Sequence, residues 1–97
     1  MRIISRKALR EFWKRHADSE APLRAWFKEA KEAGWKGPSE VKDRYASASF
    51  LANDRVVFHI KGNDYRLVVA VRYDFGIVFI RFVGTHAEYD EIDAATI

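Results

Sequence analysis

The sequence contains no cysteine. This absence excludes a disulfide, a thiolate metal site and a thiol nucleophile, and it fits a reducing compartment. No stretch approaches the ~18 apolar residues of a membrane span. The opening MRIISRKALREFWKRH also lacks the apolar region of a signal peptide. We therefore expect a cytoplasmic protein that does not contact the membrane.

Metal and nucleotide motifs are missing as well. The three histidines, His16, His59 and His86, do not have metal-ligand spacing, and the five glycines form no loop that could cradle a phosphate. We therefore expect neither a metal nor a cofactor. Apolar mass, in contrast, is plentiful: 48% of the 97 residues are hydrophobic and 14% are aromatic. This is enough for one core, so we expect a single domain over residues 1–97.

Charge is distributed unevenly along the chain. The net charge is +3, but residues 1–44 hold 12 Lys/Arg and 7 Asp/Glu, whereas residues 45–97 hold 5 and 7. A basic surface favours nucleic acid or another polyanion as partner. The ordinary alternative is a solvated helical surface.

The hydrophobic period changes from helical spacing to strand alternation near Phe50. The segment GND at 62–64 has the composition of a hairpin turn, and Thr85 is placed to cap a final helix. We predict an α+β fold, with two N-terminal helices packed on a small antiparallel sheet and a short C-terminal helix. The predicted elements are strand 2–4, helices 5–16 and 20–33, a short helical turn that starts at Pro38 and Ser39, strands 55–61, 65–73 and 77–83, and helix 86–92.

Alternation divides the strand residues between two faces of the predicted sheet. It places Val78, Ile80 and Phe82 toward the helices, and Arg81 and Val83 on the opposite, open face. The acids near these strands fall in turns, so the open face should carry positive charge without counterions and attract an external anion. For any single arginine, a cross-strand ion pair is the ordinary alternative. The cationic or titratable residues predicted on this face are His59, Lys61, Arg66, Arg72 and Arg81.

This set of side chains suits the cleavage of RNA. The substrate's own 2′-OH attacks the phosphate, so the protein supplies a base, an acid and fixed positive charge. Histidine suits proton transfer near neutral pH, and arginine matches phosphate oxygens. Tyr89 follows His86 by three residues in GTHAEYD and could stack on a base or bind a phosphate, or simply pack.

The segment VVFHIKGNDYRLVVAVRYDFGIVFIRFVGTHAEYDEI resembles the HigB toxins of the RelE-like superfamily. The resemblance implies the toxin of a type II toxin–antitoxin system, which cuts mRNA on the 70S ribosome without a metal, through the 2′-OH. It also implies a helix-turn-helix antitoxin of the HigA type as partner. Many RelE-like enzymes have Lys or Arg where this chain has His86. The alternative is a non-nucleolytic toxin of the same fold that binds RNA or acts on gyrase.

The resemblance also implies roles for individual residues. We expect His86 to act in proton transfer, with Arg66 and Arg81 stabilising the phosphate. The remaining members of the predicted catalytic set are Lys61, which would assist, His59 and Tyr89. The residues predicted to bind RNA or the ribosome are Arg6, Lys7, Arg10, Lys14 and Arg72.

Overall fold

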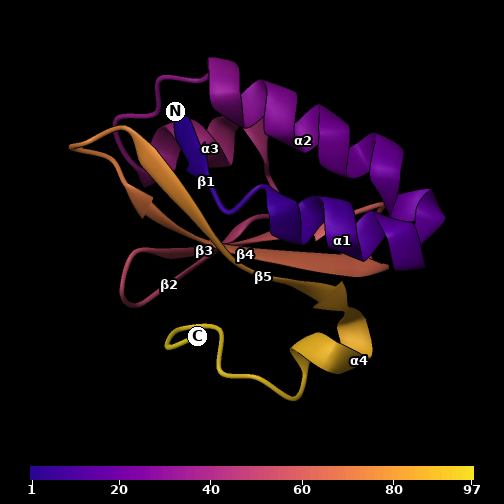
Figure 1. Cartoon of the computed structure of the whole chain (residues 1–97). Coiled ribbons are helices and arrows are strands. Elements are labelled where there is room, and N and C mark those ends of the chain that lie inside the picture. Colours follow the sequence, from indigo (N-terminus) through magenta and orange to yellow (C-terminus); the bar gives the residue numbers. More distant parts are fainter.

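The computed structural model describes residues 1–97 and has the predicted α+β architecture (Figure 1). The short 3-10 turn Ala17–Ser19 joins the first two helices. No helix is long and apolar enough to cross a membrane. The elements are β1 (Arg2–Ile4), α1 (Lys7–Arg15), α2 (Glu20–Glu32), α3 (Pro38–Arg44), β2 (Ser49–Leu51), β3 (Arg55–Ile60), β4 (Tyr65–Arg72), β5 (Ile77–Thr85) and α4 (His86–Tyr89).

The five strands form one sheet in the order β1-β5-β4-β3-β2. All neighbours are antiparallel except β1, which runs parallel to β5. The order of the predicted elements is confirmed. The helical turn predicted to start at Pro38 is confirmed as α3, whereas the short edge strand β2 was not predicted.

Helices α1, α2 and α3 cover one face of the sheet, and this interface holds the main core (Figure 1). Leu9 and Phe12 of α1 and Leu23 and Trp26 of α2 are almost fully buried there. They pack against alternating residues of the central strands, such as Leu67, which has no exposed surface. The face that alternation assigned to the helices is therefore the face that they cover.

A β-bulge at Arg81 changes which way the end of β5 faces. Val68 of β4 pairs with Phe82 while its neighbour Val69 pairs with Ile80, so Arg81 is the extra residue. Beyond the bulge the alternation is inverted. The prediction for Phe82 and Val83 was therefore wrong: Phe82 packs on the open face, and Val83 lies against the main core.

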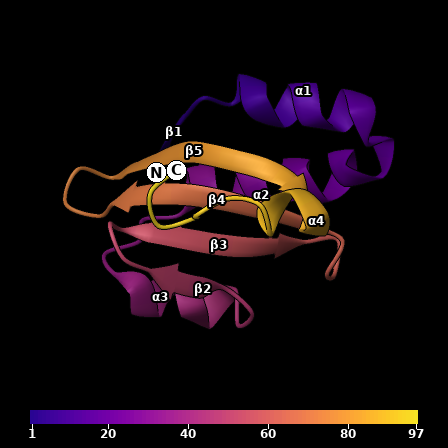
Figure 2. The ribbon, with the colours of Figure 1, turned by 90° about the horizontal axis from the view of Figure 1, so that it is seen from below.

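The C-terminal segment after α4 lies across the open face of the sheet (Figures 1 and 2). Ala94 is 6% exposed and packs with Val57 of β3 and Val68 of β4, flanked by Phe82. The segment covers one part of this face. The end of the sheet near the β3–β4 turn carries most of the predicted site residues.

Candidate active site

The turn between β3 and β4 positions the site. Lys61 and Gly62 both adopt left-handed backbone conformations, with φ of +53° and +64°. Glycine adopts this conformation without strain, whereas lysine does so rarely. Because strand β3 ends at Ile60, Lys61 does not continue the alternation of the strand. The turn therefore separates Lys61 from the open face to which the sequence assigned it.

Arg66 is the only charged residue that is buried, with 6% of its surface exposed. Its Nη1 donates to the main-chain oxygens of Asn63 (2.8 Å) and Tyr65 (3.3 Å), and its Nη2 donates to Asn63 Oδ1 (3.3 Å). Nε has no hydrogen-bond acceptor within the protein, and it is accessible to solvent. No carboxylate lies within ion-pair distance of this guanidinium.

His59 of β3 lies directly opposite Arg66 of β4. Cross-strand partners share a face, so the imidazole and the guanidinium are neighbours on the open side. Partial burial lowers the pKa of His59, and the positive charges of Arg66 and His86 lower it further, against a hydrogen bond with Asn63 that raises it. The lowered pKa favours the neutral imidazole, which is the form that can accept a proton.

Helix α4 brings the GTHAEYD residues to the same end of the sheet. Thr85 caps the helix as predicted: its side chain accepts from the Glu88 N–H (3.2 Å), and its own N–H donates to Glu88 Oε1 (2.8 Å). This last bond holds the pKa of Glu88 below its usual value. The helix places the Tyr89 ring 5.9 Å from the Arg66 guanidinium carbon, a cation–π distance.

His86 is exposed at the start of α4, and its Nδ1 lies 3.1 Å from Asp90 Oδ2. A carboxylate at this position orients the imidazole ring. When His86 is protonated, its charge also lowers the pKa of His59. The structure thus groups four of the six predicted catalytic residues at one corner of the open face: His59, Arg66, His86 and Tyr89.

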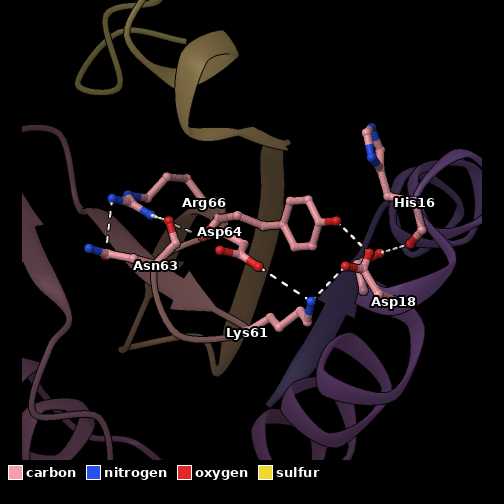
Figure 3. A network of polar contacts seen from close by, with 8 residues as sticks. His16, Asp18, Lys61, Asn63, Asp64 and Arg66 are labelled. Atoms are coloured by element: carbon pink, nitrogen blue, oxygen red, sulfur yellow. Dashed lines mark hydrogen bonds and ion pairs between the residues drawn. The ribbon is translucent and has the colours of Figure 1, made fainter.

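Lys61 points away from this corner (Figure 3). Its Nζ lies 2.7 Å from Asp18 Oδ2 and 3.4 Å from Asp64 Oδ2, and the Tyr65 hydroxyl donates to the other oxygen of Asp18. These contacts tie the β3–β4 turn to the connection between α1 and α2. The expectation that Lys61 lies on an open face without counterions was therefore wrong, because two acids neutralise it.

Two further arginines lie apart from the corner. Arg81 is the exposed bulge residue, and its Nε donates to the main-chain oxygen of Ile97 (3.1 Å), which also accepts from Arg55. Arg72 is six residues along β4 from Arg66, about 20 Å away at strand spacing. It faces Asp74 at 3.7 Å and stacks over Phe75. The predicted cluster of five cationic groups therefore does not form.

The predicted binding residues of the N-terminal helix lie on the helical side of the molecule. Lys7 pairs with Glu11 at 3.6 Å, whereas Arg10 and Lys14 are exposed without an acidic partner. Arg6 stacks over Phe27 at 4.3 Å and borders a groove of about 530 Å³ between α1 and α2. This surface is basic, and the sheet separates it from Arg66.

Three residues at or beside the site were missed by sequence reasoning. Asn63 was assigned only to a turn, although both of its oxygens bind Arg66. Asp90 is absent from the predicted site, although its spacing of four from His86 on a helix signals contact. Asp18 carried no such signal, because its partners are 43 and 47 residues away.

An α+β fold with three helices on one face of a mostly antiparallel sheet fits the RelE-like proteins. Residues 19–92 match the family model described as HigB_toxin, the RelE-like toxic component of a toxin–antitoxin system. The chain belongs to the HigB toxin family.

Curated relatives agree with this assignment. The chain is 30% identical over 92 residues to the mRNA interferase toxin HigB of Escherichia coli K12, a match that covers 93% of this chain and 88% of the relative. The same figures hold for the proteins named mRNA interferase HigB in Escherichia coli O157:H7 and Shigella flexneri.

Proposed function

We propose that this chain is the toxin of a type II toxin–antitoxin system and an endonuclease that cuts mRNA on the ribosome. The relatives are named mRNA interferases, and the likeness extends over nearly the whole chain. The observation that carries the proposal is the buried Arg66, a cation without a carboxylate partner beside two histidines and a tyrosine.

The corner contains the groups that cleavage through the 2′-OH requires. His59 is held neutral and is the candidate base that removes the 2′-OH proton. His86, oriented by Asp90, is then the candidate acid for the leaving 5′-oxygen. Arg66 supplies positive charge to the crowded phosphate, and Tyr89 offers a ring to a base or a hydroxyl to the phosphate. No step in this mechanism requires a metal.

Dependence on the ribosome is supported by the shape of the site. None of the four surface cavities is lined by His59, Arg66 or Tyr89. An open corner with few contacts holds a flexible single strand weakly, so another body must orient the mRNA. We assign that role to the ribosome, with the exposed cations of α1 as its contacts and a helix-turn-helix antitoxin as the neutralising partner.

Primer extension on a defined mRNA in a purified translation system tests the proposal. Wild-type protein should produce cuts only when ribosomes translate the message, and His86→Ala should reduce them about 100-fold or more. Arg2→Ala is the control, because it removes an exposed arginine of the edge strand β1. Intact mRNA with wild-type protein would refute the nuclease and favour a toxin that acts by binding alone.

A further inference from the structure

Arg66 is buried, yet it has no carboxylate partner. A buried cation normally acquires a carboxylate partner, because an unpaired charge away from water is costly. The acceptors of Arg66 are instead neutral: two main-chain oxygens and the side-chain amide oxygen of Asn63. The guanidinium is held in place while its full charge remains.

The residue next to Asn63 is an acid, but its carboxylate does not contact Arg66. Asp64 follows Asn63 in the turn, and its carboxylate lies 3.4 Å from Lys61 Nζ. Figure 3 shows Asn63 beside Arg66 on one side of the turn and Lys61 pointing to Asp18 on the other. Within this turn, the side-chain amide of Asn63 contacts the buried Arg66, and the carboxylate of Asp64 contacts the exposed Lys61.

We propose that Asn63 is a positioning residue for the RNA-cleaving site, which orients Arg66 through neutral oxygens so that the positive charge stays available to the substrate phosphate. This inference rests on the proposed function. An aspartate in place of Asn63 would offer the same reach and an equivalent acceptor. It would also form an ion pair with the guanidinium and compete with the phosphate for it.

Four variants separate the geometry of this contact from its charge. Asn63→Ala removes the side-chain acceptor but keeps the main-chain oxygen that binds Nη1. Asn63→Asp keeps the acceptor and adds the charge. The double variant Asn63→Asp/Asp64→Asn keeps the net charge of the protein and moves one carboxylate from Lys61 to Arg66. Asp64→Asn alone is its control.

The measurements are ribosome-dependent cleavage, binding of a short single-stranded RNA across a salt series, and thermal melting. We expect cleavage to fall about threefold to tenfold in Asn63→Ala and about 100-fold in the two variants that contain the Asn63→Asp change. The slope of log binding constant against log salt should shrink by about 0.7 in those two, which corresponds to one lost phosphate contact on a single strand. Asp64→Asn should stay within about twofold of wild type.

The order of the variants decides between a charge role and a structural role. If Asn63 only supported the fold, Asn63→Asp would cut better than Asn63→Ala, because the aspartate restores the acceptor. The aspartate variant should instead cut worse than the alanine variant while melting at or above the wild-type temperature. Its smaller salt slope of RNA binding would assign the loss to Arg66 rather than to His59, which also bonds with Asn63. Equal or better cleavage by the double variant would overturn the inference and leave the nuclease proposal intact. Absence of cleavage by wild-type protein would instead refute the proposed function, and the binding series would then test Asn63 by itself.

Discussion

The β3–β4 turn is flanked by two cations, Lys61 and Arg66, whose surroundings differ in charge. On one side Lys61 is exposed and faces two carboxylates, those of Asp18 and Asp64. On the other side Arg66 is buried and has only neutral acceptors. The first arrangement neutralises a charge in contact with water, and the second preserves a charge that is largely withdrawn from it.

The difference indicates which cation can serve a substrate. Lys61 can bind a phosphate only by giving up its ion pairs with Asp18 and Asp64. Its contacts tie the helical layer to the hairpin. Arg66 has no anion to release, so a phosphate that reaches it gains the whole interaction. The comparison therefore favours an anchoring role for the Lys61 side of the turn, and it supports our proposal that Arg66 serves the chemistry.

The largest expected contrast in cleavage is between the variants that remove Arg66 and Lys61. Arg66→Ala should lower ribosome-dependent cleavage about 100-fold to 1,000-fold, because it removes fixed charge from the phosphate transition state. Lys61→Ala should lower it by less than about fivefold. Primer extension measures both, with circular dichroism to confirm that each variant is folded. Similar losses in the two variants would contradict the division of roles.

The pH dependence of cleavage tests His59 on the Arg66 side. Burial and the charges of Arg66 and His86 lower the pKa of His59 from 6.5, so the neutral form persists below that pH. More than half of His59 should therefore still be neutral at pH 6.5, and the acid-side midpoint of cleavage should lie below that pH. In Arg66→Ala one cause of the lowered pKa is gone, and the residual activity should begin to fall at a higher pH. An acid-side midpoint well above 6.5 in wild type would exclude His59 as the base.

Much of the fold could be predicted because it depends on local patterns. Apolar stripes identified α1 and α2, alternation identified β3 to β5, and Thr85 identified the start of α4. The pairing of His59 with Arg66 follows from the short turn between two predicted strands. These features need only the hydrophobic period and the composition of the turn.

The errors arose where one residue departs from its element. The bulge at Arg81 inverts the alternation beyond it, and no composition signal marks the site. The left-handed backbone of Lys61 ends β3 one residue early and sends its side chain toward the helices. Contacts such as that of Lys61 with Asp18 join residues distant in sequence, and periodicity carries no information on them.

Gly84 lies beside Arg66, and its lack of a side chain leaves room for Phe82 and Glu88. It pairs with Arg66 across the strands, and a Cβ added there would overlap the Phe82 ring and lie 3.2 Å from Glu88 Oε1. Gly84→Ala should therefore destabilise the protein by about 1–3 kcal/mol and disturb the helix that carries His86. Chemical denaturation measures the loss. Gly34→Ala is the control, because a Cβ at Gly34 meets nothing within 4 Å.

The smallest expected effect comes from the anchoring side. Asp18→Asn keeps one acceptor for Tyr65 but removes the charge that faces Lys61. Cleavage should stay within about twofold of wild type, because these contacts position elements rather than substrate. The melting temperature should fall slightly at neutral pH, whereas Asp43→Asn, which alters an exposed acid of α3 with no ion pair, should not lower it.

Acid pH should abolish the difference in melting temperature between wild type and Asp18→Asn. Hydrogen bonds from Lys61 and Tyr65 lower the pKa of Asp18 from 3.8 in the folded protein. A carboxyl with a lowered pKa stabilises the fold fully above its unfolded value and ceases to do so as the pH falls through the folded value. The melting temperatures of wild type and Asp18→Asn should therefore converge only below pH 3.8. Convergence near neutral pH, or a large loss of cleavage in Asp18→Asn, would show that the anchoring side of the turn takes part in the chemistry.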